Sequence, residues 1–319
     1  MWSYLVRRLA QAILILFIIT MLCFALTRLS SDPMSQYALK PNMTEADRAE
    51  IRARLGLDQP MPIQYIKWLG LALAGDLGYS FFSHQSVLLL IQQRLPMTLT
   101  LMITAEFFIV TIGLFLGLVS AVRPYSFLDN LITSFSFIGF SMPIFFIALG
   151  CIELFAVQFK ALGWPYLPTG ADIWNTKDPL QMIRHLILPV FCLVAIQTAG
   201  YSRYLRSSIL EVLGQDYIRT ARAKGLKFSV VLYKHALRNA ILPFVTIVGL
   251  DIPFLMGGAL VTESVFSWPG MGRLFWEYAQ RGDYPVVLGV LLLTSSAVVF
   301  FTIIVDMAYT MIDPRIRLG

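Results

Sequence analysis

The sequence lacks the short motifs that mark enzymes which hydrolyse nucleotides or peptides. The dipeptide Gly-Lys does not occur, so the chain contains no P-loop of the form G-x-x-x-x-G-K-[ST]. No G-x-S-x-G motif occurs, and the three histidines, His84, His185 and His235, form no H-E-x-x-H pair. We therefore expect no catalytic residue, no metal site and no cofactor in this chain.

Charged residues are also scarce. They make up 14% of the 319 residues, whereas a soluble domain carries about 25%. Hydrophobic residues make up 57%, and the mean hydropathy is +0.70, so we predict a protein of the lipid bilayer. The three cysteines, Cys23, Cys151 and Cys192, fall in apolar runs and suit small packing residues. The pI is about 9.3, but the placement of the basic residues argues against nucleic acid as a partner.

Apolar runs long enough to cross a bilayer, about 20 residues each, occur six times and predict an all-α, polytopic membrane protein. Asp178-Pro179 is a helix-start signal, so the fourth helix is expected to begin near Asp178 and to continue past Arg206. The predicted spans are Leu9–Thr27, Thr98–Val122, Ile132–Phe159, His185–Tyr201, Ile241–Thr262 and Val286–Asp306.

Lys and Arg predict the orientation of these spans. If the N-terminus is cytoplasmic, the inner segments hold 13 Lys and Arg in 67 residues, and the outer segments hold 12 in 118 residues. We therefore expect both termini in the cytoplasm. The expected organisation is a first span at 1–27, a folded cap on the outer surface at 28–97, and a five-span core at 98–319 with a cytoplasmic loop at 202–240.

The outer segment 28–97 is too long for a simple connector. It predicts an amphipathic helix at Glu45–Leu55, with Thr44 as N-cap, and a second helix at Ser86–Arg94 that ends before Pro96.

The stretch Gly214–Pro243 is the longest basic interruption in the second half of the chain. Asp216 is expected to cap a short helix, and Gly225 to close it in a left-handed conformation. Tyr217, Ile218 and Ala221 are expected to share one face of this helix. A second basic helix, Phe228–Asn239, is expected to lead into the membrane, with an interruption at Pro243.

Two interpretations of this basic stretch are open. The first is an anchor on anionic lipid. The second is a docking helix, since the small residues Thr220, Ala221 and Ala223 allow another surface to approach closely.

Four acidic residues lie within the predicted spans or at their ends, namely Glu106, Glu153, Asp251 and Asp306. Asp251 is near the middle of its span, where an aspartate costs roughly 3 kcal/mol. Such a residue either faces a transport pathway or finds a partner on a neighbouring helix.

Ordered motifs along nearly the whole chain resemble the permease subunits of ABC importers, in particular the first permease of the dipeptide/oligopeptide/nickel branch (MetI-like fold). The chain departs from the general importer signature, because Arg219-Thr220 stand where Glu-Ala is usual and Gly225 to Pro243 is five residues longer. The peptide branch shares that departure. The matching stretches include Gln215–Leu226, His235–Ala240, Arg54–Pro60, Gly75–Ser80, Ser141–Phe145, Val265–Arg273, Arg281–Pro285 and Asp313–Arg317.

The resemblance implies a bacterial inner-membrane protein that pairs with a second permease, two cytoplasmic ATPases that bind ATP and Mg, and a periplasmic substrate-binding protein. The residues expected to dock on an ATPase are Gln215, Asp216, Tyr217, Ile218, Arg219, Thr220, Ala221, Arg222, Ala223, Lys224 and Gly225.

The resemblance and the polar residues also indicate two further sets of site residues. Ser141 and Pro143 are expected either to break a helix beside the pathway or to serve helix packing. Candidate pathway residues are Ser141, Pro143, Asp251, Glu106 and Glu263. Candidate residues for binding-protein docking and the gate are Trp268, Pro269, Gly270, Asp283 and Tyr284.

The transported substrate is expected to be a di- or oligopeptide. Nickel chelate, glutathione, an opine or a sugar are alternatives within the same permease type. A stand-alone secondary transporter and a membrane scaffold or receptor are rival classes.

Overall fold

The computed structural model describes residues 2–30, 58–170, 178–255 and 259–312. Within these residues the chain is helical apart from loops and one isolated bridge between Tyr79 and Ser86. The predicted helix Glu45–Leu55 lies outside the described residues. The helical segments are α1 (Trp2–Ser30), α3 (Met61–Leu73), α4 (Val87–Val122), α5 (Phe127–Ser141), α6 (Ile144–Cys151), η1 (Ile152–Gln158), α7 (Phe159–Ala161), α8 (Pro179–Leu213), α9 (Asp216–Ala223), α10 (Phe228–Val230), η3 (Val231–Leu237), α11 (Arg238–Leu255), α12 (Leu260–Val265), α13 (Met271–Gln280) and α14 (Tyr284–Ile312).

Within the described residues, five helical segments are long and apolar enough to cross a membrane, and they correspond to five of the six predicted spans. The fifth predicted span, Ile241–Thr262, is divided between α11 and α12, and residues 256–258 between them are not described. The fourth helix begins after Asp178, whose carboxylate accepts from the backbone N–H of Leu180 at 2.9 Å, as the sequence predicts.

Three predicted boundaries are wrong. Helix α4 starts at Val87 and continues through Pro96 without a break, and α11 likewise continues through Pro243. Helices in bilayers tolerate proline in their interior. Next to Pro96, the carbonyl of Met97 accepts from the Trp268 indole N–H at 3.0 Å, which ties α4 to the segment after α12. The third span is not continuous, because the chain becomes extended at Met142.

The break at Met142 follows from the proline after it. A residue that precedes proline is disfavoured in the helical region, and Met142 has ψ 131°. Of the two alternatives for Ser141 and Pro143, the helix break is thus present in the structure. Helix α5 becomes a separate helix, and the apolar span begins instead at Ile144.

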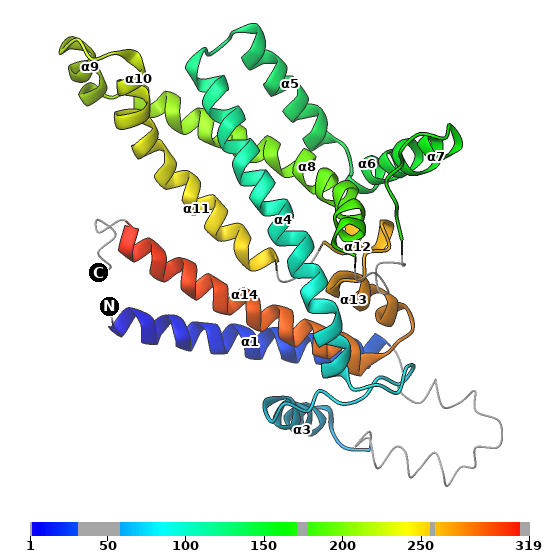
Figure 1. Cartoon of the computed structure of the whole chain (residues 1–319). Helices are drawn as coiled ribbons and strands as arrows, with labels where there is room; N and C mark the ends of the chain where they lie inside the picture. The colour runs from blue at the N-terminus through cyan, green and yellow to red at the C-terminus, as the bar shows by residue number, and fades with distance from the viewer. Residues whose placement is uncertain (1, 31–57, 171–177, 256–258, 313–319) are drawn as a thin grey trace.

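Helices α4, α8 and α11 form the central bundle (Figure 1), and their buried side chains make up the main core cluster. Helices α1 and α14 lie side by side, with the start of α1 and the end of α14 at the left of the view, the same side as α9. Helix α3 of the cap packs on α1, where the Tyr65 and Thr20 hydroxyls are 2.8 Å apart.

Candidate functional site

Helix α9 is the short amphipathic helix that the basic stretch predicts. Its N-cap is Gln215 rather than Asp216, and Asp216 is the first helical residue. The carboxylate of Asp216 caps no backbone N–H. Instead it accepts from Arg219 Nη1 at 3.2 Å on the exposed face. An acid in the first turn still interacts favourably with the helix dipole.

The end of α9 is closed by Gly225, as predicted. Gly225 has φ +75°, a conformation that glycine adopts without a steric penalty. Its N–H donates to the Arg222 carbonyl at 2.9 Å, and the Leu226 N–H donates to the Ala221 carbonyl at 3.4 Å. These two bonds form a Schellman motif, which stops the helix and turns the chain toward α10.

The inner face of α9 packs on its own chain. Ile218 is fully buried and Ala221 is 6% exposed, and both contact Val231 and Ala236 of η3. Burying an isoleucine side chain stabilises by about 1.5–3 kcal/mol, so this contact holds α9 against the start of α11. Tyr217, predicted on the same face, is 45% exposed.

The Tyr217 hydroxyl links α9 to the next membrane helix, because it accepts from Asn239 Nδ2 at 3.1 Å. The outer face of α9 is polar, mostly basic and open. Its exposed residues, with those of the adjoining turns, are Gln215, Asp216, Tyr217, Arg219, Thr220, Arg222, Ala223, Lys224 and Gly225.

Two of the predicted intramembrane acids come together in the central bundle. The Tyr201 hydroxyl of α8 lies 2.9 Å from Glu106 Oε1 of α4 and 2.7 Å from Asp251 Oδ2 of α11. Tyr201 and Glu106 are buried, and Asp251 is half-buried. Sequence reasoning identified both acids but missed Tyr201, which joins them.

A G-x-x-x-G pair on α4 explains why α8 comes so close. A Cβ added at Gly113 would lie 2.8 Å from Tyr201 Cβ, and one added at Gly117 would lie 2.8 Å from the Ser202 carbonyl oxygen. Small residues four apart let helix backbones approach in a bilayer. This spacing was the available sequence signal for the α4–α8 contact.

Glu263, the third predicted pathway acid, is completely buried in α12. Its carboxylate accepts from Thr98 Oγ1 at 2.8 Å and from the Arg273 N–H at 3.0 Å, while the Met271 N–H donates to Thr98 Oγ1 at 2.7 Å. The carboxylate therefore ties the first turn of α13 to α12 and α4. Burial raises the pKa of the Glu263 carboxyl, although these hydrogen bonds oppose the rise.

Ser141 and Pro143, the remaining predicted pathway residues, are both exposed and flank the break between α5 and α6.

The predicted docking and gate residues of the last outer loop lie beneath the surface. Asp283 accepts from Ser80 Oγ at 2.6 Å and from the Phe82 N–H at 3.0 Å, so it fixes the outer segment to the start of α14. Because these side chains are buried within the chain, their role in binding-protein docking or gating stays a prediction. The buried residues are Trp268, Pro269, Gly270, Asp283 and Tyr284.

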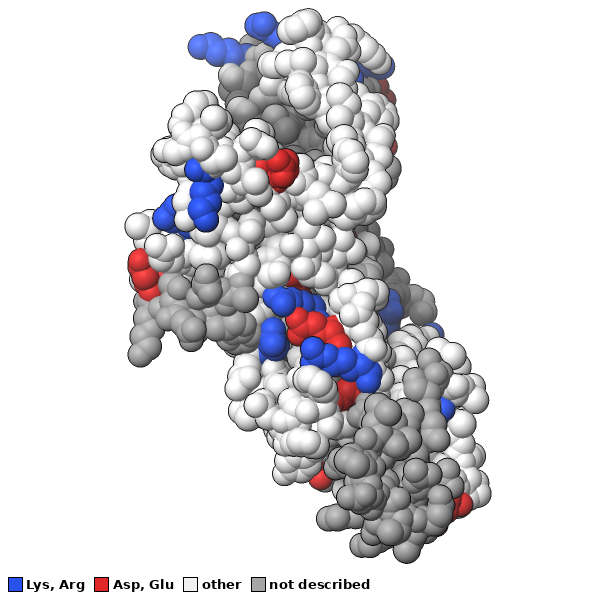
Figure 2. All heavy atoms as spheres, turned by 90° about the vertical axis from the view of Figure 1, so that its right-hand side faces the viewer, with Lys and Arg blue, Asp and Glu red and all other residues white. Residues whose placement is uncertain are grey.

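Exposed groups surround that buried set. Figure 2 shows a mostly uncharged face on which basic and acidic side chains gather near the centre, at the height of α13 in Figure 1. Arg273 and Glu277 of α13 form an ion pair at 2.6 Å, and the Arg281 guanidinium lies 4.0 Å from the centre of the Phe82 ring. Trp276 is 46% exposed on the same helix.

A further polar cluster escaped sequence reasoning altogether. Asp129, in the first turn of α5, is 2% exposed and accepts two hydrogen bonds from Arg206 of α8. In the sequence, Asp129 is simply one of the acidic residues in the segments predicted to be cytoplasmic. No local signal pairs it with Arg206, which is 77 residues away.

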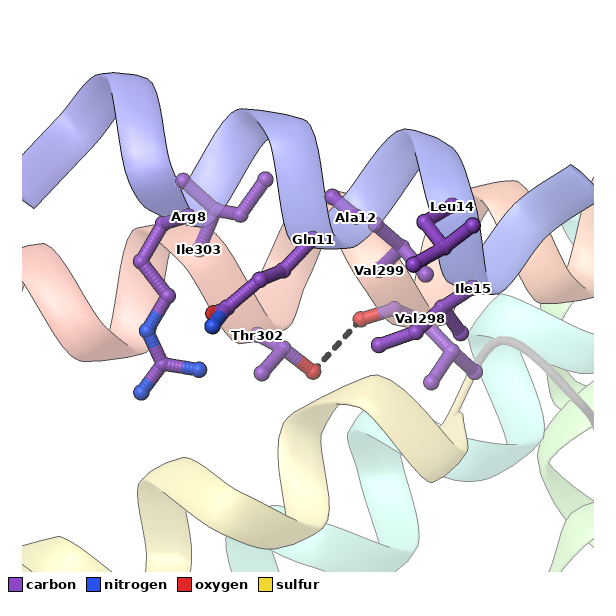
Figure 3. Close-up of a pocket in the computed structure, with 9 residues that line it drawn as sticks. All are labelled: Arg8, Gln11, Ala12, Leu14, Ile15, Val298, Val299, Thr302 and Ile303. Carbon is purple, nitrogen blue, oxygen red and sulfur yellow. Dashed lines mark hydrogen bonds between the residues drawn. The ribbon is translucent and has the colours of Figure 1, made fainter.

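A groove of about 440 Å³ runs between α1 and α14. Figure 3 shows the side chains of Arg8, Gln11 and Thr302 on it, with the Thr302 hydroxyl donating to the Val298 carbonyl at 2.7 Å. The other lining residues are apolar, and none belongs to α9 or to the Glu106–Tyr201–Asp251 cluster.

The helices and spans define the chain as an all-α, multi-pass membrane protein. A solved structure, described as an amino acid ABC transporter with histidines, shares this fold with a TM-score of 0.54 and 16% identity. The match covers 70% of this chain and 94% of that one.

Family models identify the chain more closely. The family described as "Binding-protein-dependent transport system inner membrane component" matches residues 113–318, and the corresponding N-terminal family matches residues 1–102. The chain belongs to this family of ABC importer permeases. It is therefore an inner-membrane transport component, as the resemblance implies.

Curated relatives match over the full length. The oligopeptide transport system permease protein AppB of Bacillus subtilis is 43% identical over 321 residues, covering 99% of this chain and all of the relative. The dipeptide transport system permease protein DppB of Escherichia coli K12 is 37% identical over 338 residues, covering 99% of both chains.

Proposed function

We propose that this chain carries di- or oligopeptides across the bacterial inner membrane, and that α9 is the site where a separate ATPase docks. The observation that carries the docking proposal is the two-faced character of α9. Its apolar face packs against η3. Its polar face is exposed, and in the chain α9 lies between α8 and the continuous helical segment α10–η3–α11. The peptide substrate is supported by the names of the relatives at 37–43% identity.

The working complex contains this permease, a second permease, two ATPases and a periplasmic binding protein. ATP and Mg bind the ATPases, and this chain contributes no catalytic group. Both termini lie in the cytoplasm, and the position of α9 on the same side as the start of α1 and the end of α14 supports this orientation.

The docking contact is made by exposed residues of α9 and not by all of the predicted set. Ile218 and Ala221 support the helix from within, so they shape the site without touching the partner. Thr220 and Ala223 are small and exposed, and they let the ATPase surface approach the helix backbone.

The Ala223→Glu variant tests the docking face. We expect ATPase co-purification and ATP-dependent peptide uptake to fall about tenfold, which corresponds to about 1.4 kcal/mol of binding free energy. Thermal stability should not change, because Ala223 is exposed. Ser229→Glu, at an exposed position of α10, is the matched control and should behave as wild type.

Ala221→Glu is a second variant, with a different expected result from Ala223→Glu. It places a charge in the buried contact with η3, so it should lower thermal stability as well as uptake. If α9 is only a lipid anchor, Ala223→Glu will leave ATPase stoichiometry unchanged, and the docking proposal fails. ATP-independent uptake by the purified chain would instead identify a secondary transporter.

The pathway passes the Glu106–Tyr201–Asp251 cluster. Its two acids suit the protonated amino group of a peptide, and Asp251 is the more accessible of the two. Ser141 and Pro143 flank exposed non-helical backbone at the α5–α6 break, which suits the wall of a cavity. Glu263 has no exposed surface, and we assign it a supporting role at the outer end of the pathway.

The binding protein docks on exposed groups of the outer loops, with Trp276 and Arg281 as the contact residues. The buried set that includes Trp268 and Asp283 holds this surface in shape.

A further inference from the structure

Asp129 and Arg206 form a highly connected charged contact at the α9 end of the membrane bundle. Arg206 Nε donates to Asp129 Oδ1 at 2.8 Å, and Nη2 donates to Oδ2 at 2.7 Å. The carboxylate also accepts from the Ser120 hydroxyl, from the Tyr125 N–H at 2.7 Å and from the Thr133 hydroxyl at 3.5 Å. A single carboxylate thus joins the end of α4, the start of α5 and α8.

The backbone around this contact is held in an unusual conformation. Tyr125 has φ +62°, which is uncommon for a residue other than glycine. This turn directs the Tyr125 N–H at the Asp129 carboxylate, and the Arg206 guanidinium lies 5.7 Å from the centre of the Tyr125 ring. Such strain persists where the surrounding contacts enforce it, and it often marks a functional position.

The position of Arg206 connects this contact to α9. Arg206 is seven residues before the end of α8, or about 10 Å along the helix axis. Only Gly214 and Gln215 separate α8 from α9. A force applied to α9 therefore reaches Arg206 through continuous helix and a two-residue turn.

Helices α4 and α5 both approach α8 closely at glycines, and α5 is in addition joined to α8 by the Asp129–Arg206 ion pair. Helix α4 is locked by close packing at Gly113 and Gly117. Among the described side chains of α5, only Asp129 and Ser136 are buried. Towards its other end, Gly139 approaches the Ala195 carbonyl. The ion pair is therefore the strongest polar connection between α5 and α8.

A buried ion pair is weak evidence for stability, because an apolar pair of similar size often stabilises a fold equally well. The bidentate geometry fixes the relative position of the two helices more tightly than apolar packing does. The hydrogen bonds from Arg206 also hold the pKa of the Asp129 carboxyl well below its usual range, so the pair stays charged.

We propose that the Asp129–Arg206 pair is a positioning contact that makes the α4–α5 hairpin move with α8 when an ATPase acts on α9. This proposal rests on the proposed docking function of α9. Helix α5 leads through the extended residue Met142 into the span that begins at Ile144. The contact thus adds a connection from α8 to the third span near α9, besides the direct packing of Ala148 and Cys151 on Leu188 and Cys192 of α8.

The test uses the full complex of both permeases, the ATPases and the binding protein, reconstituted in proteoliposomes. ATP hydrolysis and uptake of a radiolabelled peptide are measured together. The double variant Asp129→Leu/Arg206→Met replaces the pair by apolar side chains and avoids an unpaired buried charge. We expect it to retain its ATPases and to hydrolyse ATP, while uptake per ATP falls about tenfold, within the range of measured coupling effects.

Two single variants sharpen this result. Arg206→Lys keeps the charge but loses the two-pronged geometry, so it should lower uptake per ATP by a smaller factor. Asp129→Asn removes the charge that Arg206 binds, so it should also lower uptake per ATP. Asp178→Asn, at the opposite end of α8, makes the same chemical change and is its control. Asparagine is an equally good N-cap, so Asp178→Asn should keep the wild-type uptake of peptide per ATP hydrolysed.

The possible outcomes separate this proposal from the docking proposal. If the double variant takes up as much peptide per ATP hydrolysed as the wild type, the positioning role is overturned. Failure of the double variant to assemble also overturns it, because the pair would then be required for folding. If the α9 variants lose their ATPases while the double variant keeps the wild-type uptake per ATP, the docking proposal is supported and the positioning proposal is overturned.

Discussion

The two ends of the molecule use buried carboxylates in different ways. At the end away from α9, Glu263 and Asp283 accept hydrogen bonds from hydroxyls and backbone N–H groups, which fixes loops to helix ends. At the α9 end, Asp129 accepts two hydrogen bonds from the Arg206 side chain on another helix. The Glu263 and Asp283 contacts hold loops against helix ends, whereas the Asp129 contact joins two separate long helices.

Removal of Glu263 should have the largest effect on stability. Glu263→Ala leaves the Thr98 hydroxyl and the Arg273 N–H without their acceptor. Each buried donor without a partner costs about 1–3 kcal/mol, so for two donors we expect a loss of about 2–6 kcal/mol. The measurement is thermal unfolding of the purified protein in detergent.

Glu153→Ala is the matched control for this prediction. Glu153 is exposed and bonds only locally, to Gln158 Nε2 at 2.7 Å, so its removal should leave the melting temperature almost unchanged. Equal melting temperatures for the two variants would contradict the anchoring role of Glu263.

The pH dependence of stability should have opposite signs at the two ends. Arg206 lowers the folded-state pKa of Asp129, so its contribution is present above the unfolded pKa of about 3.9 and is lost as the pH falls toward the folded value. Burial raises the pKa of Glu263. Its contribution is therefore most favourable below the unfolded pKa of about 4.3 and declines as the pH rises through the folded value.

Melting temperatures between about pH 3 and pH 8 test this difference through two isosteric variants. Asp129→Asn should reduce the loss of stability on the acid side. Glu263→Gln should reduce the decline toward neutral pH. The interpretation fails if both variants change the profile in the same direction.

The smallest effect on thermal stability is expected for residues on the exposed, polar face of α9. Asp216 and Arg219 form an ion pair with side-chain exposures of 94% and 76%, and such pairs contribute at most about 1 kcal/mol. The double variant Asp216→Ala/Arg219→Ala should therefore keep its melting temperature and lose ATPase co-purification. A large drop in melting temperature would show that this face stabilises the chain itself.

Features that depend on nearby residues were predictable from the sequence. Hydropathy located the spans, Asp178-Pro179 located the start of α8, and Gly225 located the end of α9. Pro143 marked the break in the third span, because proline restricts the residue immediately before it.

Features that depend on distant partners were not predictable in the same way. Pro96 and Pro243 are strong local stop signals, but both remain inside helices. The burial of Ala221 and Trp268 depends on segments that only the folded chain brings close. The contact between Glu106 and Asp251 required Tyr201, which carries no local pattern.

The Schellman closure at Gly225 and the buried Ile218 have a further consequence for recognition. A helix of eight residues is unstable in water by itself, yet α9 is already formed on its own chain. The proposed docking of an ATPase therefore requires no ordering of this segment, so little conformational entropy is lost on binding. A free peptide of residues 214–226 should consequently be a poor competitor, although it carries every exposed side chain of the helix.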